Sequence, residues 1–452
     1  MFKKLLLIIC ILFTSEVFGA SFTTVEVFQN QVNSHISERM GDLINKPKNS
    51  NVRFFKLNFD LLLGNEPFEI ELIRGSKLQF EKDDLTIRTF DSYSWRGKIK
   101  GNINSRAIFA VEGQDLSGNI TIDSMLFEIR PMGDGIHSIS EIEKTFLKNE
   151  AESLILPKPL SSIEKDFQTF KDDGSTIDVM IAYTQDVKNR YSNITTLMQL
   201  AVDNTNQYYI NSGIVQRVRL VKTMLVSYVE SGDPSTDLTR LQSSSDNYLN
   251  EIHPVRDTYG ADIVTLCVSR MDGACGIGYM MTPELQSIFA AGAFNVVDVD
   301  CGSLTYAHEL GHNMGAHHDA AQPGTGWGSY SKGFVDSDNN FKTIMAYGNE
   351  TRVGYFSDDT IKYGNNPVGS DIADNVRTLN ETRNIVANFR SSTAAGSSSS
   401  SSSSSGSGGS GSSGSCFIGL IKDQNNLKGV FSLFLSILFL PFLIYVISGR
   451  KN

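Results

Sequence analysis

Positive charge is in short supply in this chain of 452 residues. Lys and Arg number 40 against 50 Asp and Glu, which gives a formal net charge of −10 at pH 7. A protein that binds nucleic acid needs a basic surface to displace the counterions of the phosphates. The charge balance therefore argues against nucleic acid as a partner, and it indicates little else because net charge bears mainly on solubility.

Cysteine and histidine are also scarce, and neither is spread evenly. The sequence has five Cys, none of them between Phe22 and Leu266, and seven His, of which four lie in residues 308–318. With 40% hydrophobic residues and ~100–200 residues per domain, the chain has room for two or three folded domains. The composition therefore differs from one part of the chain to another, and the two ends are distinct from the middle.

The N-terminus has the layout of a secretory signal peptide. Lys3 and Lys4 precede an apolar run at residues 5–13, and the small residues Gly19 and Ala20 mark the expected cleavage site. The apolar run is too short for a membrane-spanning helix, which needs ~20 residues. Residues 1–20 are therefore predicted to be a signal peptide, and the protein is predicted to be exported.

The C-terminus divides into a tether and a hydrophobic segment. Residues 391–415 are almost purely Ser and Gly, which is typical of a flexible linker. Residues 416–452 begin with Cys416 and contain an uncharged stretch, residues 430–447, ahead of a basic tail. That stretch just spans a bilayer core, so it predicts a transmembrane anchor. The layout also resembles bacterial sorting signals that retain a protein at the cell surface or release it, and both alternatives stay open.

Two folded regions are expected between these ends. The first has short alternating or aromatic-rich runs that predict strands of an all-β unit, at residues 52–59, 68–73, 85–90, 107–111 and 126–129. A polar stretch, residues 144–174, follows as a linker open to proteolysis. The second region predicts strands at 176–183, 215–226 and 261–268, a helix at 194–212, and a helix at 238–258 broken at Pro254. This alternation indicates an α/β fold with a sheet of mixed direction.

The histidine cluster carries the chemistry. On a helix, His308 and His312 are ~40° apart in angle and ~6 Å apart along the axis, so both can bind one metal ion. Glu309 lies on the adjoining face, within reach of a metal-bound water. Gly315 permits the sharp turn that ends the helix, and His318 returns as a third ligand. Three His ligands leave one position of tetrahedral zinc open, as catalytic zinc requires.

This pattern resembles the metzincin zinc endopeptidases, whose signature is HExxHxxGxxH followed by a methionine turn. Asp319 after the third His is similar to the adamalysin/reprolysin branch, and residues 343–347, with Met345, resemble the methionine turn. The segments 354–357 and 379–383 resemble the end of the domain in bacterial secreted members. The resemblance implies a zinc-dependent endopeptidase that acts on proteins or peptides, with Met345 as an apolar floor below the zinc.

The resemblance also implies a division of the chain. Residues 175–390 correspond to a metzincin catalytic domain, an α/β (α+β) fold with a mixed twisted sheet and an active-site helix. Residues 21–174 are similar to a β-rich propeptide with its processing linker. Substrate would lie along an edge strand, and the pocket for the residue after the scissile bond would be walled by residues 348–356. The edge-strand residues are Gly276, Ile277, Gly278 and Tyr279.

The proposed chemistry uses zinc and two side chains. Zinc would lower the pKa of its water toward ~7 and polarise the substrate carbonyl. Glu309 would accept the water proton and return it to the leaving amine. Tyr347, which reprolysins usually lack, is either a donor that stabilises the oxyanion or a packed aromatic. His317 falls outside the ligand spacing, and it is expected either to be exposed or to contact a ligand without binding the metal itself.

The cysteines bear on latency and on stability. Many reprolysins keep their precursor latent with a propeptide Cys on the zinc, but residues 21–174 contain none, so latency here would need another group or blockage of the cleft. In an exported protein a disulfide is plausible. Cys275–Cys301 is favoured, with Cys267 as a buried thiol, although three cysteines allow other pairings.

A different class of function also fits the fold. The chain could be a surface adhesion or binding protein in which a metzincin fold is catalytically silent. The intact set of zinc ligands, Glu309, Gly315 and Met345 disfavours this alternative. Oligomeric state, bond specificity and natural substrate are not predicted.

Overall fold

A computed structural model describes residues 20–393, except 48, 74–75, 124, 143–153 and 156–171. Of the predicted signal peptide, residues 1–20, only Ala20 is described, and of the predicted linker, residues 391–415, only 391–393 are; the segment 416–452 with its Cys416 lies outside the described residues. Among the helices that are described, none is long and apolar enough to cross a membrane. The predictions for the two ends of the chain therefore stay predictions.

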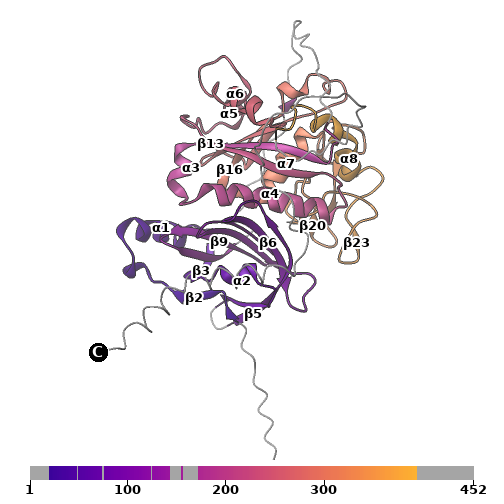
Figure 1. The fold of residues 1–452 in the computed structure, drawn as a ribbon. Helices are drawn as coiled ribbons and strands as arrows, with labels where there is room; N and C mark the ends of the chain where they lie inside the picture. Colours follow the sequence, from indigo (N-terminus) through magenta and orange to yellow (C-terminus); the bar gives the residue numbers. More distant parts are fainter. Residues whose placement is uncertain are drawn as a thin grey trace, which may run out of the picture. The chain divides into compact units, whose positions relative to one another are not determined.

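The N-terminal region is a ten-stranded sheet that curves on itself (Figure 1). Only β1 and β4 are parallel neighbours, and the other pairs are antiparallel. In spatial order the strands are β1 (Ala20–Ser21), β4 (Phe68–Ile73), β5 (Ser76–Ile87), β6 (Ser92–Ile99), β7 (Arg106–Glu112), β8 (Asp115–Ile122), β9 (Met125–Gly133), β10 (Ile136–Ile142), β3 (Asn49–Leu57) and β2 (Thr23–Glu26).

The first residues of this region close the sheet into a barrel. β1 pairs with β4 and β2 pairs with β3, so residues 20–26 join the two ends of the strand order. Phe22 lies at the junction, where its N–H donates to Glu69 O at 2.8 Å and its carbonyl accepts from Asn58 N at 2.9 Å. Closure removes the exposed edges that an open sheet would present.

The barrel is filled by aromatic rings. Trp95 lies 5.1 Å from Phe109 and 5.3 Å from Phe68 between ring centroids, and all three are fully buried. The helices α1 (Ser34–Ile44) and α2 (Asp60–Leu63) and the 3-10 turn η1 (Gln29–Gln31) belong to the same region. The prediction of an all-β unit is confirmed, but the segment 85–90 extends past the end of β5, and β6, β8 and β10 were not predicted.

The second region contains a six-stranded mixed sheet. Its order is β11 (Leu154–Ile155), β15 (Gly276–Met280), β16 (Phe294–Asp298), β14 (Ile263–Val268), β12 (Thr176–Tyr183) and β13 (Arg217–Leu225). β15 is antiparallel to β16, and the remaining pairs are parallel. β14 is buried along its whole length, which explains its unbroken apolar sequence. The predicted mixed α/β fold is confirmed.

Helices and short strands complete this region. The helices are α3 (Gln185–Arg190), α4 (Ile194–Asn211), α5 (Pro234–Gln242), α6 (Ile252–Tyr259), α7 (Ser303–Asn313) and α8 (Asn375–Val386), with 3-10 turns η3 (Phe289–Ala291) and η4 (Val299–Cys301). The short strands are β17 (His317–Asp319), β18 (Lys332–Gly333), β19 (Val335–Asp336), β20 (Phe341–Lys342), β21 (Thr351–Arg352), β22 (Lys362–Tyr363) and β23 (Asn366–Pro367). α7 packs on β15 and β16, and α4 packs on α7.

The prediction of one helix broken at Pro254 is wrong. Two helices, α5 and α6, are separated by residues 243–251, and Pro254 lies in the first turn of α6. A proline is tolerated there because the N–H groups of the first turn have no partner within the helix.

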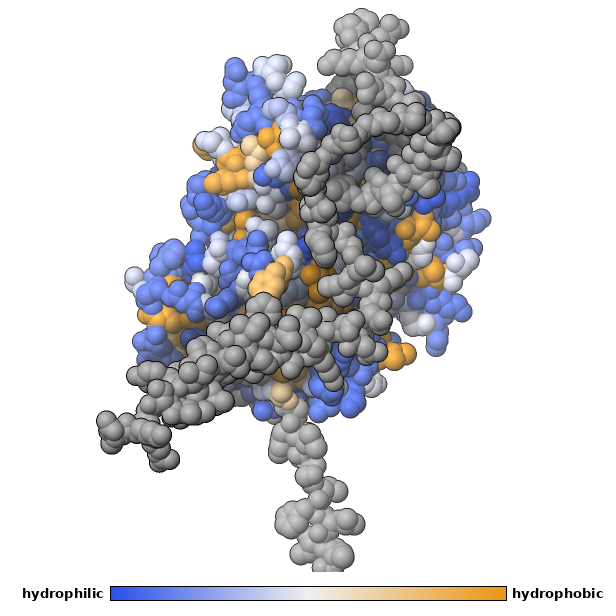
Figure 2. Space-filling model, in the orientation of Figure 1, coloured by the Kyte–Doolittle hydropathy of each residue, from blue (hydrophilic) through white to orange (hydrophobic). Residues whose placement is uncertain are grey.

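Helix α4 also contacts the barrel strands β7 and β8. Polar side chains join the two regions: the hydroxyls of Ser117 and Thr196 lie 2.8 Å apart, and Arg130 donates to the Tyr191 hydroxyl at 2.6 Å. The visible surface of the described residues is mainly hydrophilic, with small separate hydrophobic patches (Figure 2). Each region also has its own buried hydrophobic cluster.

Candidate metal centre

Helix α7 holds the first half of the site. It begins after Gly302, and every residue from Thr305 to Asn313 is buried. The helix ends at Asn313 and is capped by Met314, and the next residue, Gly315, takes a φ of +91°. A side chain on Gly315 would be strained at this angle, and its Cβ would lie 3.1 Å from the Met281 carbonyl oxygen. The turn at Gly315 sends the chain directly into β17, which carries His318.

The three predicted ligands converge. Their Nε2 atoms lie 3.0 Å apart for His308 and His312, 2.9 Å for His312 and His318, and 3.3 Å for His308 and His318. All three rings are buried, and among the described residues they form the group able to hold a metal ion. Tetrahedral zinc with Zn–N bonds of about 2.05 Å would place its ligand nitrogens about 3.3 Å apart. The observed spacings are close to that value.

Backbone carbonyls set the orientation of two rings. His308 Nδ1 lies 2.9 Å from Ile344 O, and His312 Nδ1 lies 2.9 Å from Ala316 O. A carbonyl oxygen only accepts, so each Nδ1 must carry the proton and each Nε2 must present its lone pair. Converging lone pairs repel one another unless a cation lies between them. The donor set therefore fits zinc.

Burial and neighbouring rings keep His318 neutral. Burial lowers the pKa of His318 well below the ordinary value, and the charges of His312 and His308 act in the same direction. A neutral imidazole is the form that binds a metal ion. Burial thus favours the neutral form of His318.

Glu309 is completely buried beside the edge strand β15. A Cβ placed on Gly276 would lie 2.5 Å from Glu309 Oε1, and one on Gly278 would lie 3.1 Å from Oε2. The two glycines predicted to bind substrate therefore face the Glu309 side chain. Ile277 and Tyr279 belong to the hydrophobic core of the domain.

Asn313 is a residue of the site that sequence reasoning missed. Its Nδ2 donates to Tyr279 O at 2.8 Å and to Phe294 O at 3.1 Å, and its Oδ1 accepts from Asn295 at 2.7 Å. These bonds tie the end of α7 to β15 and β16. The only available signal was a polar residue next to the second ligand, which is too common to interpret.

Asp319 joins the third ligand to the methionine turn. Its Oδ2 accepts from Tyr347 N and its Oδ1 from Ala321 N, both at 2.9 Å. Met345 is buried against α7, where a Cβ on Gly311 would lie 2.6 Å from its sulfur. Asp319 and Met345 thus fix the turn against the helix that carries two ligands.

Two aromatic side chains flank His318. The Tyr347 ring is 4.0 Å from the His318 ring and 6.0 Å from the His308 ring between centroids. His317 is directed elsewhere, with Nδ1 3.4 Å from Lys332 Nζ, and burial together with Lys332 lowers the pKa of His317 to about 4. An exposed place for His317 is wrong, since only 6% of its surface is accessible.

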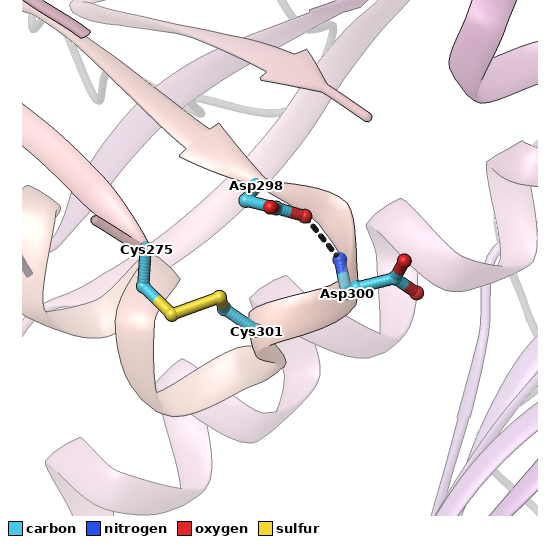
Figure 3. The surroundings of a disulfide bond; sticks show 4 residues. All are labelled: Cys275, Asp298, Asp300 and Cys301. Carbon is cyan, nitrogen blue, oxygen red and sulfur yellow. Dashed lines mark hydrogen bonds between the residues drawn. A yellow bond between two sulfur atoms is a disulfide. The ribbon is translucent and has the colours of Figure 1, made fainter. Parts of the chain in front are cut away.

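The structure joins Cys275 and Cys301 by a disulfide (Figure 3). The bond connects the residue before β15 with the last residue before Gly302 and α7. Nearby, Asp298 Oδ1 accepts from Asp300 N at 2.9 Å, and the Asp300 carboxylate accepts from Lys46 Nζ at 2.9 Å and from the Tyr191 hydroxyl at 2.5 Å. Cys267 is a buried free thiol in β14, and burial raises its pKa.

Comparison with known proteins identifies the family. The family model of metallo-peptidase family M12 matches residues 173–357. A peptidyl-Asp metalloendopeptidase of Xanthomonas campestris pv. campestris is 33% identical, and the match covers 63% of this chain and 70% of the relative. A second one, from Stenotrophomonas maltophilia, is 29% identical over 78% of this chain and 89% of the relative.

A solved structure, metalloproteinase-II from Bacteroides fragilis, matches 57% of this chain and 84% of its own length with a TM-score of 0.38 and 13% identity. The residues matched by the family model include the three converging histidines. The chain belongs to metallo-peptidase family M12 and is a metzincin-like metalloendopeptidase.

Proposed function

We propose that this chain is an exported zinc endopeptidase that is made as a precursor and cleaves peptide bonds next to aspartyl residues, with Glu309 as general base. The observation that carries the proposal is the convergence of three buried imidazole Nε2 atoms, two of them from the helix that also carries the buried carboxylate of Glu309. Export is supported by the signal-like N-terminus and by the disulfide, which is typical of oxidising compartments.

The reaction divides between the metal and the chain. His308, His312 and His318 would hold zinc, which would supply a water with a pKa of about 7 and polarise the substrate carbonyl. Glu309 takes the proton from that water and delivers it to the leaving amine. The carbonyls of Ile344 and Ala316 hold two ligand rings in their tautomers, and Asp319 holds the methionine turn. Burial of the ligands excludes bulk water and strengthens each charge interaction.

Tyr347 has a place in this reaction as a donor to the oxyanion. Its ring packs on His318, and its backbone is fixed by Asp319, so the phenol is held beside the ligands. Donors that are already oriented stabilise developing charge at no reorganisation cost. Packing alone would explain the ring equally well, and Tyr347→Phe separates the two roles. A donor role requires a lower kcat, and a packing role leaves kcat unchanged.

The aspartyl preference rests on two observations. The relatives carry peptidyl-Asp in their names. In this chain β21 contributes a cationic side chain, Arg352. The residue lies in the segment 348–356 expected to wall the pocket after the scissile bond, where a guanidinium would pair with a carboxylate.

The precursor has a strand that covers the expected substrate edge. β11 pairs in parallel with β15, with Leu154 opposite Tyr279 and Ile155 opposite Met280. An extended substrate would need the same backbone groups of β15. Occupation of this edge keeps the precursor latent without a cysteine, and removal of the segment is the activating step.

Glu309→Gln tests the reaction most directly. The variant keeps the size of the side chain and the zinc ligands but loses the base. We expect zinc bound at the wild-type ratio and kcat on a denatured protein lowered by about 10³-fold. The wild type with a chelator is the matched control for metal dependence. Cutting by Glu309→Gln at the wild-type rate would overturn the role of Glu309, and no cutting by any form would favour a silent binding protein.

Paired peptides that differ only in Asp or Asn after the scissile bond test the preference. Arg352→Gln should lower kcat/KM for the Asp peptide by about 10–100-fold and leave the Asn peptide nearly unchanged. Arg377→Gln, which breaks the surface pair with Glu381 on α8, is the control and should alter neither. Equal losses on both peptides would contradict a specificity role for Arg352.

Latency is tested by comparing the unprocessed chain with its Ile155→Pro variant. Proline removes an N–H and disfavours pairing with β15. The unprocessed wild type should cleave peptides at a small fraction of the processed rate, and the variant should recover activity before processing. An unprocessed wild type that is fully active would refute latency, and an inactive variant would refute this strand as its cause.

A further inference from the structure

The edge strand next to the metal centre has glycine at alternate positions. In β15, Gly276 and Gly278 lie on one face of the strand, because successive residues point to opposite faces. Ile277 between them packs into the hydrophobic core. Glycine weakens a strand and contributes no packing, so two glycines on one face mark a place where something else approaches closely.

The group that approaches is the Glu309 side chain. A Cβ on Gly276 would lie 2.5 Å from Oε1, 2.8 Å from Cγ and 2.9 Å from Cδ of Glu309. A Cβ on Gly278 would lie 3.1 Å from Oε2 and 3.2 Å from Asn295 Cβ. Both carboxylate oxygens of Glu309 therefore lie where the strand has no side chains. Neither glycine has a positive φ that would itself require glycine.

We propose that Gly276 and Gly278 are positioning residues. Because neither has a side chain, the Glu309 carboxylate can lie against β15 in the orientation that catalysis requires. The proposal rests on the proposed role of Glu309 and adds the part of the chain that orients it. It also changes the prediction that these two residues bind substrate. The space left by their missing side chains holds the Glu309 carboxylate, while the backbone of β15 stays available for an extended substrate.

The distances predict that a methyl group added at Gly276 lowers the catalytic rate much more than the stability of the fold. At Gly276 the colliding atoms belong to the end of a flexible side chain, which can rotate away at low cost to the fold. The same rotation moves a catalytic group, and a misplacement of about 1 Å can lower a rate on the order of 100-fold. Gly278 has more room, so the effect of a methyl group there is expected to be smaller.

The experiment compares Gly276→Ala, Gly278→Ala and the control Gly328→Ala in enzyme isolated from cells that express the full chain. At Gly328 a Cβ would lie 2.6 Å from the Tyr330 ring, a contact as tight as that at Gly276 but with a side chain outside the metal centre. We expect kcat lowered about 100-fold for Gly276→Ala and a few-fold for Gly278→Ala, with KM and bound zinc unchanged. Gly328→Ala should keep the wild-type kcat. An unchanged kcat for Gly276→Ala, or a higher KM alone, would overturn the proposal.

A double-mutant cycle, measured by thermal unfolding of the metal-free protein, tests the contact independently of catalysis. Gly276→Ala should lower the unfolding midpoint of the metal-free protein by about 3 °C when Glu309 is present. In the Glu309→Ala background the added methyl has no carboxylate to meet, so the decrease should vanish. Equal decreases in both backgrounds would refute positioning through Glu309. A clear coupling combined with full activity of Glu309→Gln would instead refute the role of Glu309 as base.

Discussion

The barrel and the catalytic region both bury histidine, but the rings contact the backbone with opposite polarity. In the barrel, His137 Nε2 accepts a hydrogen bond from Leu116 N at 3.0 Å. In the catalytic region, His308 and His312 donate from Nδ1 to carbonyl oxygens. A ring that accepts from the backbone has used the lone pair that a metal would need. A ring that donates keeps that lone pair. A buried histidine therefore supports the fold in the barrel, whereas in the catalytic region it is able to bind a metal ion.

Strand glycines differ between the two regions in a similar way. In the barrel, Gly97 makes room for the Trp95 ring and Gly118 for the Phe109 ring. In the catalytic sheet, Gly276 makes room for the Glu309 carboxylate. A ring packed among other rings cannot move aside, whereas a carboxylate can. Substitution should therefore lower stability in the barrel and catalytic rate in the catalytic region.

Loss of a metal ligand should give the largest effect and should be confined to one region. His312→Ala leaves two ligand nitrogens, and we expect bound zinc to fall below one tenth of an equivalent and kcat/KM to fall at least about 10³-fold. Metal analysis and peptide cleavage measure both. The control is His137→Gln, which should bind zinc normally. Retained zinc in His312→Ala would mean that the converging nitrogens do not form the metal centre.

The disulfide is the next largest contribution, and the barrel has no equivalent because residues 22–266 contain no cysteine. Cys275 and Cys301 close a loop with a sequence separation of 26 residues. A loop of this size contributes about 3 kcal/mol to the free energy of unfolding. The double variant Cys275→Ser/Cys301→Ser should lose that amount in urea unfolding of the catalytic region. A loss of equal size in the barrel transition would show that the two regions unfold together.

Acid should destabilise the barrel through His137. Burial lowers the pKa of His137 to about 4, against an ordinary value of about 6.5 in the unfolded chain. Between these values the unfolded state binds more protons, so stability present above about pH 6.5 is lost as the pH falls. The expected loss from pH 6.5 to 4 is about 3 kcal/mol.

Urea unfolding of the wild type and of His137→Gln at several pH values measures this loss. The Gln amide oxygen can accept the Leu116 N–H but does not titrate in this range. The free energy of unfolding should fall more steeply with falling pH in the wild type than in the variant, by about 1.4 kcal/mol per pH unit in the middle of the interval. Parallel slopes would show that His137 is not the group that responds.

Sequence reasoning predicted what depends on local spacing. The spacing of His308, His312, Gly315 and His318 predicted that the three imidazoles converge, because helix geometry and one glycine turn fix their directions. Asn313 could not be predicted, since its three partners lie on strands whose pairing only the fold reveals. The pairing of β11 with β15 was also beyond reach, because two residues between linker segments show no periodicity.

The failed helix prediction has the same cause. Pro254 was treated as a break because its effect inside a helix is large, but its effect depends on the turn in which it lies. Which turn that is depends on where α6 begins, and Ile252 is placed by burial in the core and not by a capping side chain. Local propensity therefore identified the helical region but not the helix boundaries.

The smallest predicted effect tests the comparison of glycines. In Gly97→Ala, the new Cβ would lie 2.2 Å from Trp95 Cη2 and 2.3 Å from the Glu81 carbonyl oxygen. Trp95 is packed against Phe68 and Phe109, so neither contact can relax easily.

Overpacking of this kind costs about 2 kcal/mol of unfolding free energy. Urea unfolding measures it, with Gly64→Ala as the control, because the nearest atom to a Cβ there is 3.6 Å away. The kcat of the isolated enzyme should not change in either variant. If Gly97→Ala lowered kcat while Gly276→Ala lowered only stability, a glycine's role would not follow from the rigidity of the group it faces, and the comparison of the two regions would fail.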